Sequence, residues 1–295
     1  MSTDALFAFA RERYSIKLRR EQGLPRAEWT SDPVLSEYRF CNVFREDDRV
    51  TRWMRTGLTR PLGSDFARQI RAAVVFRWFN KIETGELLAD LLLEDWNTEE
   101  ARRRLKARVA EGLPILGAAY MIKSPLYTNK VDGLLQCIDA VNWHLPELAS
   151  HVEPGETELA GFHAMLTGGV FPYLGPFMGY EMVTDLRHSP VLDQAPDIMT
   201  WASAGPGAAR GLARLADLPL DAFNHHSARD QAGMNESMRL ILEVSKSSRF
   251  WPADWPRWEM REVEHVLCEF DKYERARLGE GRPKQRFVPL EEKQS

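Results

Sequence analysis

Three observations predict an all-α fold for this chain of 295 residues. Apolar residues recur every three to four positions along most segments, which is the period of a helix that buries one face. Capping residues, glycines and prolines stand at the ends of these segments, as they do at helix boundaries. The apolar–polar alternation of a strand is almost absent, and ILGAAYMI (115–122) is the one segment that resembles it.

The expected helices begin with an arginine-rich one over residues 4–22, which an extended linker (GLPRAEWTSDP) follows. The remaining helices are expected over residues 39–56, 65–84, 99–111, 129–149, 155–168, 176–187, 206–217, 230–247 and 256–278. This order predicts an N-terminal helical arm (1–30), one large helical domain (31–280) and a flexible tail (281–295).

The composition is that of an ordinary globular protein, with 44% hydrophobic and 28% charged residues. A formal net charge of −4 gives no bulk attraction to nucleic acid, so any basic surface has to be local. Cys41, Cys137 and Cys268 form no CxxC pair, which argues against a zinc ribbon or a disulfide framework and suits a reducing cytoplasm. We find neither a signal peptide nor an apolar run of the roughly 20 residues that a membrane span needs.

The segment 39–56 predicts a helix with two distinct faces. Its apolar stripe contains Phe40, Val43, Phe44, Val50 and Met54. Asp47 falls within this stripe, and because a buried carboxylate needs a fixed partner, we expect an arginine from another helix beside it.

The opposite face of that segment combines Asn42, Arg45, Glu46, Arg49 and Trp53. An asparagine can donate to and accept from the edge of a base, and arginine binds phosphate oxygens with two N–H groups. This face is therefore a candidate ligand surface. The alternative is a salt-bridged surface helix on which Trp53 packs against a neighbour.

Two glycine–proline elbows, Leu174-Gly175-Pro176 and Gly205-Pro206-Gly207, each precede an expected helix. The first turn of a helix has unpaired N–H groups and a positive dipole end, so it can hold a phosphate. Between the elbows lie four carboxylates, and Trp201 stands at the second elbow. These carboxylates belong to Glu181, Asp185, Asp193 and Asp197. The alternative is an ordinary corner between two helices.

Two further polar groups stand near helix ends or on a helix surface. Asn80 and Lys81 lie in the segment RWFNKIET, near the end of an expected helix, and are candidate ligand-binding residues. The alternative is that Lys81 only interacts favourably with the negative end of the helix dipole. His265, Glu269 and Lys272 share a polar face but lack the HExxH spacing, so no metal site is predicted. A GxxxxGKS/T phosphate loop, a GxSxG elbow and a GxGxxG motif after a strand are all missing from the sequence.

Five blocks in order resemble a known family of phage DNA base-hypermodification proteins. The blocks are EYRFCNVFREDDRVTRW (37–53), RWFNKIET (77–84), FPYLGPFMGYEMVTDL (171–186), PDIMTWASAGPGAARGL (196–212) and REVEHVLCEFDKY (261–273). The family is that of the alpha-glutamyl/putrescinyl thymine pyrophosphorylases, or amino-acid:DNA transferases, which share a helical domain with 5-hydroxymethyluracil DNA kinases. The resemblance spans about residues 30–285. Because the kinases carry a phosphate loop that these residues lack, it favours the transferase branch.

The resemblance implies a function in thymine hypermodification. A kinase pyrophosphorylates 5-hydroxymethyluracil in DNA, and the transferase replaces pyrophosphate with an amine, often that of glycine. The implied partners are modified DNA, glycine and other phage hypermodification enzymes in the host cytoplasm, and no membrane. No cluster of ligands in the sequence demands a metal cofactor, and a Mg²⁺ ion on the pyrophosphate is compatible with the chemistry.

The helical core of this family is also similar to helix-hairpin-helix DNA glycosylases. Residues 173–176 would then stand for the hairpin and Asp197 for the carboxylate beyond it. The lysine of bifunctional glycosylases has no counterpart, because Phe177 and Met178 follow the elbow. Two alternatives stay open: a glycosylase-like excision enzyme, and a DNA-binding module without catalysis.

Transfer to a base predicts roles for the candidate residues, which are shared between segments 39–56 and 196–211 in one cleft. The base leaves the stack, and Trp53 or Trp201 stacks on it while Asn42 or Asn80 reads its edge. Arg45, Arg49 and the helix start at Gly205 and Gly207 stabilise the leaving pyrophosphate. Lys81 and Arg210 are further candidates for binding the substrate or DNA. Glu181, Asp185 or Asp197 takes the proton of the incoming amine.

Overall fold

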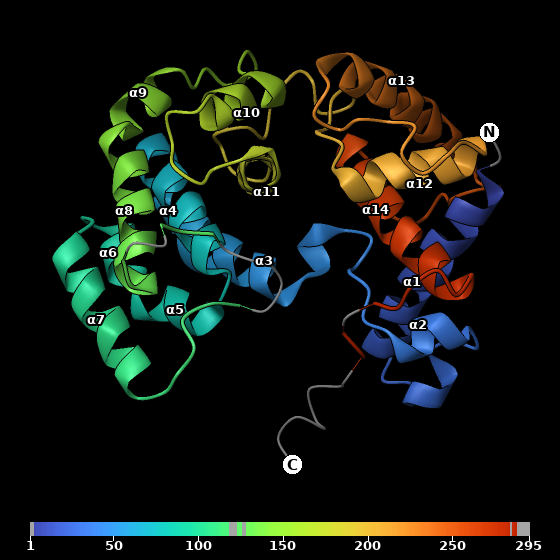
Figure 1. Cartoon of the computed structure of the whole chain (residues 1–295), viewed down its shortest axis with the longest axis horizontal. Coiled ribbons are helices and arrows are strands. Elements are labelled where there is room, and N and C mark those ends of the chain that lie inside the picture. The colour runs from blue at the N-terminus through green and yellow to red at the C-terminus, as the bar shows by residue number, and fades with distance from the viewer. Residues whose placement is uncertain (1–2, 118–122, 126–127, 284, 288–295) are drawn as a thin grey trace. The chain divides into compact units, whose positions relative to one another are not determined.

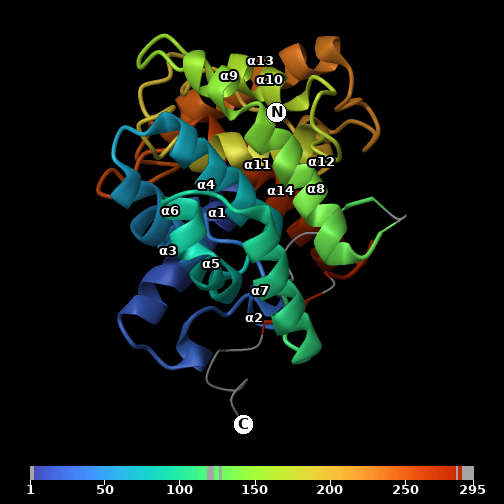
Figure 2. The ribbon, with the colours of Figure 1, turned by 90° about the vertical axis from the view of Figure 1, so that its left-hand side faces the viewer.

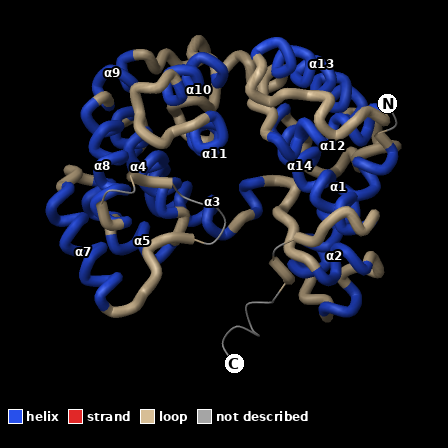
Figure 3. Tube along the Cα trace, in the orientation of Figure 1, coloured by secondary structure: helices blue, strands red, loops and turns tan. Residues whose placement is uncertain are grey.

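The computed structural model describes residues 3–117, 123–125, 128–283 and 285–287. All regular secondary structure in these residues is helical, which confirms the all-α prediction (Figure 3). The exception to helix and loop is one isolated antiparallel bridge between Tyr38 and Arg286. Residues 115–117 form no strand, and the rest of the strand-like segment, 118–122, lies outside the described residues.

The chain divides into two compact units, residues 1–48 with 198–295 (unit 1) and residues 49–197 (unit 2). The helices of unit 1 are α1 (Asp4–Glu21), η1 (Arg26–Glu28), α2 (Pro33–Glu37), η2 (Arg45–Asp47), α12 (Pro206–Ala216), α13 (Ala228–Ser245) and α14 (Met260–Arg277). The expected arm and tail boundaries at residues 30 and 280 stay predictions.

The core of unit 1 forms where α12 lies against α14 (Figure 1). A Cβ atom on Gly211 would lie 2.4 Å from the carbonyl oxygen of Leu267, and one on Gly207 would lie 2.3 Å from the sulfur of Cys268. Glycine at these two positions therefore allows the helix backbones to approach closely. The core of unit 1 also contains an aromatic cluster, in which the rings of Trp251 and Trp258 lie 5.1 Å apart.

The helices of unit 2 are α3 (Arg49–Met54), η3 (Arg55–Thr59), η4 (Arg60–Leu62), α4 (Phe66–Phe79), α5 (Ile82–Leu87), α6 (Ala89–Leu93), α7 (Thr98–Ala110), α8 (Lys130–Trp143), α9 (Leu145–Ser150), α10 (Leu159–Thr167) and α11 (Pro176–Leu186). Helix α4 is central: it contacts α5, α6, α8, α9 and α11, several of which surround it in Figure 2. Every residue from Gln69 to Phe79 is buried, as expected for a helix inside a core.

The prediction of one helix over 39–56 is wrong. Residues 39–44 form no helix, a single 3₁₀ turn follows at 45–47, and α3 begins only at Arg49. Phe40 and Phe44 are buried in unit 1, whereas Met54 is buried in unit 2. The apolar stripe therefore serves two cores, and packing against each one overrides the continuous helical period.

Two other expected helices are each divided in two. The segment 65–84 breaks at Asn80, whose left-handed backbone (φ 48°) ends α4 before α5 begins. The segment 129–149 breaks at His144, because Pro146 belongs to the first turn of a new helix, α9. In the described part of the chain, none of the helices is long and apolar enough to cross a membrane.

Candidate functional site

A buried charged cluster in unit 2 contains two of the predicted site residues, Asp185 on α11 and Asn80 at the end of α4. Arg77 of α4 joins them. Its Nε and Nη2 atoms donate to the two oxygens of Asp185 at 2.6 and 2.7 Å, and its Nη1 donates to Asn80 Oδ1 at 2.7 Å. The side chains of Arg77 and Asp185 are 3% and 0% exposed. This bidentate pair links two helices of the core and orients Asn80.

Asp197 lies at the N-terminus of another helix of unit 2. Its two oxygens accept hydrogen bonds from the backbone N–H groups of Leu159 (2.7 Å) and Ala160 (2.9 Å), in the first turn of α10. A carboxylate at this place is stabilised by the helix dipole and satisfies two N–H groups that would otherwise lack a helical partner. The geometry gives Asp197 a capping role.

Glu181 is the third predicted catalytic carboxylate, and it lies on α11 one turn before Asp185. It is half-buried, whereas Asp185 and Asp197 are both buried. Its greater exposure distinguishes it from the other two as a group that a substrate could reach.

Trp53, Lys81 and Arg49 also belong to unit 2. The ring of Trp53 lies 5.1 Å from that of Phe76 and covers Gly85, where a Cβ atom would lie 2.4 Å from the indole. Lys81 Nζ pairs with Glu83 at 2.9 Å. This hydrogen bond, with a smaller contribution from the charge of the exposed Arg49, lowers the pKa of Glu83. Trp53 thus packs on a neighbour, as the alternative interpretation of this segment expected.

Asn42 takes part in a polar network in unit 1. Its Oδ1 accepts from Arg13 Nη2 at 2.7 Å, and its Nδ2 donates to Asp48 Oδ1 at 2.9 Å. Both ends of the amide are engaged in these contacts, so reading a base edge would require one of them to break. Nearby, the half-buried Arg45 belongs to the turn η2.

Asp47 has a partner from another helix, as its place in the apolar stripe predicted. The recorded pair is with Lys17 Nζ of α1, at 3.3 Å, so this partner is a lysine where an arginine was expected. The two side chains are each 17% exposed. The pair is therefore less buried than the expected ion pair.

The second elbow faces other side chains of unit 1. The N–H of Gly205 donates to Glu264 Oε1 at 3.1 Å, and the Gly207 Cα packs on Cys268. Glu264 thus places a carboxylate where a bound phosphate was expected at the start of α12. Arg210 Nε donates to the buried Asp271 at 2.9 Å, and the half-buried Trp201 precedes Ala202, whose N–H donates to Asn235.

The predicted site residues divide between the units. Unit 1 contains Asn42, Arg45, Trp201, Gly205, Gly207 and Arg210, and unit 2 contains Arg49, Trp53, Asn80, Lys81, Glu181, Asp185 and Asp197. Within unit 2 the structure brings Asn80 and Asp185 together through Arg77. The roles of these residues, and the cleft that segments 39–56 and 196–211 would share, stay predictions.

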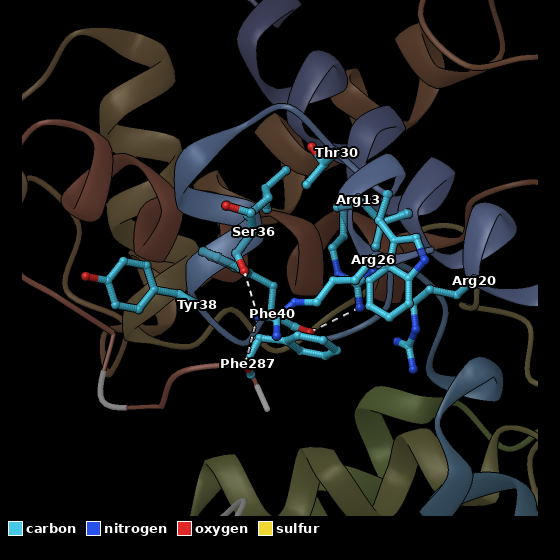
Figure 4. A pocket seen from close by; sticks show the side chains of 11 residues that line it. Arg13, Arg20, Arg26, Thr30, Ser36, Tyr38, Phe40 and Phe287 are labelled. Atoms are coloured by element: carbon cyan, nitrogen blue, oxygen red, sulfur yellow. Dashed lines mark hydrogen bonds between the residues drawn. The ribbon is translucent and has the colours of Figure 1, made fainter. Parts of the chain in front are cut away.

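Sequence reasoning missed Arg77 and a group of arginines on a pocket of unit 1, which Figure 4 shows. Arg13 and Arg20 are separated by seven residues on α1, two helical turns, which places them on one face. The spacing of these two arginines within the arginine-rich helix could therefore have indicated a shared basic face from the sequence alone. Arg26 follows on η1.

Glu262 on α14 is a buried carboxyl that the sequence did not single out. It is 3% exposed, and burial raises its pKa to about 7, although the neighbouring Arg261 opposes the shift. Its Oε2 accepts the N–H of Glu259 at 2.9 Å in a capping box.

We expect Glu262→Gln to change how stability depends on pH. Below pH 4.5 Glu262 is protonated in the folded and unfolded chains alike; between 4.5 and about 7 only the folded form keeps the proton. Its contribution to stability is therefore lost as pH rises through about 7. The glutamine variant keeps a hydrogen-bond acceptor, so it should match wild type at pH 4 and exceed it by roughly 3 kcal/mol at pH 8. Melting curves of both proteins between pH 4 and pH 8 test this prediction. If the variant and the wild type differ in stability by the same amount at both pH values, the raised pKa of Glu262 is wrong.

Metal binding has no evident site in the described ranges, where no group of three or more His, Cys, Asp or Glu side chains is arranged to hold an ion. This finding concerns ions held by protein side chains. The binding of a Mg²⁺ ion held mainly by a substrate pyrophosphate stays a prediction.

The fold and the buried clusters define an all-helical protein of two compact units. A family model described as the helical domain of 5-hmdU DNA kinase matches residues 1–282, so the chain belongs to this family. The chain is 28% identical over 230 residues to a 5-hmdU DNA kinase of Bacillus phage SP10, a match that covers 71% of this chain and 35% of that protein. The matched region thus spans about a third of the relative's length.

These matches confirm the predicted relation to the helical domain of the kinases. No solved structure matches the chain. The similarity to helix-hairpin-helix glycosylases and the assignment to the transferase branch therefore stay predictions.

Proposed function

We propose that this protein modifies 5-hydroxymethyluracil DNA by transferring an amino acid, with glycine as the first candidate, onto the pyrophosphorylated base. Two observations together support this proposal. The kinase helical domain accounts for residues 1–282, while the 295 residues contain no phosphate loop for ATP. A helical domain that acts on an already activated base needs no such loop.

In the proposed reaction the amine nitrogen attacks the exocyclic methylene carbon of the base. The new C–N bond forms as the C–O bond breaks, pyrophosphate leaves with the bonding electrons, and a carboxylate takes the amine proton. Glu181 is the proposed base, because Asp185 and Asp197 are buried in the Arg77 pair and the α10 cap. Asp185 then serves as a positioning residue for α11.

The test uses the full chain, DNA that contains 5-pyrophosphoryloxymethyluracil, and a pool of amino acids. Digestion to nucleosides and mass spectrometry should reveal an aminated thymidine, and pyrophosphate should appear in equal amount. An unchanged nucleoside profile, with the activated DNA shown to be intact, would contradict the transferase proposal.

Glu181→Gln should reduce turnover by about 10²–10⁴-fold, the usual contribution of a general base. The matched control is Glu156→Gln, which changes an exposed glutamate of the same unit and should keep the wild-type rate. If the Glu181→Gln enzyme stays fully active, Glu181 is not the base, and the same assay on Asp185→Asn and Asp197→Asn examines the two remaining candidates.

A kinase-related function is the second candidate, and the name of the phage SP10 relative favours it. It predicts that 5-hydroxymethyluracil DNA with ATP gains phosphate in the presence of this protein. Abasic sites in the same experiment would instead indicate a glycosylase-like activity. DNA binding without any product would indicate a non-catalytic module.

A further inference from the structure

We infer that the pocket between α1, η1, α2 and the segment 285–287 in unit 1 binds a terminal phosphate group. The pocket holds roughly 430 Å³ of empty space, part of it open to solvent. Its described lining consists of arginines, hydroxyl groups and apolar or aromatic side chains: Arg13, Ile16, Arg20, Arg26, Trp29, Thr30, Leu35, Ser36, Tyr38, Phe40 and Phe287.

Arg13 carries the inference, because it is a buried cation with an unused donor. The residue is 7% exposed. Its Nη2 donates to Phe40 O at 3.2 Å and to Asn42 Oδ1 at 2.7 Å, but its Nη1 is buried without a hydrogen-bond partner among the described atoms. Among the recorded ion pairs of the described residues, none involves Arg13, and burial lowers its pKa. The carboxylates of Glu269 and Asp48 partly oppose this shift. An anion that reaches Nη1 would supply the missing acceptor and would add negative charge beside a buried cation.

Two further arginines stand at the mouth of the pocket and are held by aromatic rings. The guanidinium of Arg20 lies 5.1 Å from the Trp29 ring centre and 5.5 Å from that of Phe287. Arg26 lies 5.4 Å from Phe287 and donates to the carbonyl oxygens of Ser36 and Phe287, as Figure 4 shows. A guanidinium this close to an aromatic ring is attracted to it, and the ring leaves the N–H groups at the edge of the Arg20 guanidinium able to donate.

The segment with Phe287 is fixed to the rest of unit 1. The N–H of Phe287 donates to Glu37 O at 2.9 Å, and the N–H of Arg39 donates to Gln285 O at 3.0 Å. One wall of the pocket therefore comes from a part of the chain far from α1 in sequence.

The charge of the lining selects the class of anion. Three arginines and no carboxylate line the described pocket, so an anion with two or more charges gains more there than a carboxylate does. A terminal phosphate also presents three acceptor oxygens, enough for Arg13, Arg20 and a hydroxyl at once. Because Arg13 is buried, a phosphodiester with a sugar on each side would reach it poorly. The ligand is therefore a terminal phosphate or pyrophosphate, carried by a free nucleotide or by an end or substituent of a nucleic acid.

Calorimetric titration of the full chain tests the inference, with inorganic pyrophosphate, dTMP, and a single strand with or without a 5′-phosphate as probes. Pyrophosphate should bind. The Arg20→Gln substitution should weaken the affinity for pyrophosphate about tenfold or more, as expected for the loss of one charge-assisted contact. The matched control is Arg249→Gln, since Arg249 is also an exposed arginine 5.0 Å from an aromatic ring, Phe250, but does not line the pocket.

Arg13→Lys is the second variant, because Arg20 contributes only from the surface. It should weaken binding while far-ultraviolet circular dichroism confirms that the helices persist. Binding of dTMP but not of the phosphorylated strand assigns the site to free nucleotides, and the reverse assigns it to nucleic acid. Acetate, titrated in the same way, serves as the carboxylate control. The inference is overturned if acetate binds as tightly as pyrophosphate, if no phosphate probe binds, or if both variants keep wild-type affinity.

Discussion

Replacing Asp185 with asparagine is expected to lower the free energy of unfolding by roughly 3–5 kcal/mol, the usual cost of removing one partner of a buried ion pair. The variant leaves the guanidinium of Arg77, 3% exposed, without the carboxylate that binds it through two hydrogen bonds. Chemical denaturation followed by circular dichroism measures the change.

The control for this variant removes both charges. In Arg77→Met with Asp185→Leu, no uncompensated charge stays in the core, so much of the lost stability should return. A second control, Glu156→Gln, alters an exposed carboxylate of the same unit and should unfold like wild type. If Asp185→Asn unfolds like wild type but loses turnover, the structural role is wrong and Asp185 returns to the catalytic candidates.

The second large effect is expected at the contact of α12 with α14. Gly211→Ala should destabilise the protein by about 3 kcal/mol or more, at or above the upper end of overpacking costs. The added Cβ atom would lie 2.4 Å from the carbonyl oxygen of Leu267, and because that oxygen belongs to a helix backbone, the two helices have to move apart.

Gly233→Ala provides the matched control in the same unit. Gly233 lies exposed within α13, and a Cβ atom there meets nothing within 4 Å. Alanine has the higher helix propensity, so this variant should gain about 0.5–1 kcal/mol. The close-packing explanation fails if Gly211→Ala is as stable as Gly233→Ala in the same denaturation experiment.

The sequence by itself determined the fold class and most helices. In α14, the apolar residues at helical spacing, Met260, Val263, Val266, Leu267 and Phe270, are buried, whereas Tyr273, which the same pattern assigns to the core, is half-buried. The helices that follow the two glycine–proline elbows start at Pro176 and Pro206, as expected. These features are local, because a helical period and the fixed backbone of proline act within a few residues. The resemblance of five blocks likewise identified the relation to the kinase helical domain.

The tertiary structure alone decided how the polar candidates are used. Asp185 and Asn80 were both selected, but their link through Arg77 joins residues 108 positions apart, which no local pattern encodes. No local pattern encodes the contact of Asp197 with the first turn of α10 either, or that of Glu264 with the N–H of Gly205 at the second elbow. The segment 39–56 shows the converse: its regular period predicted one helix, yet Phe40, Val43 and Phe44 pack into one core and Met54 of α3 into another. Buried carboxylates and cations take whichever partner the packed helices bring near, because leaving them unpaired costs more than local propensity supplies.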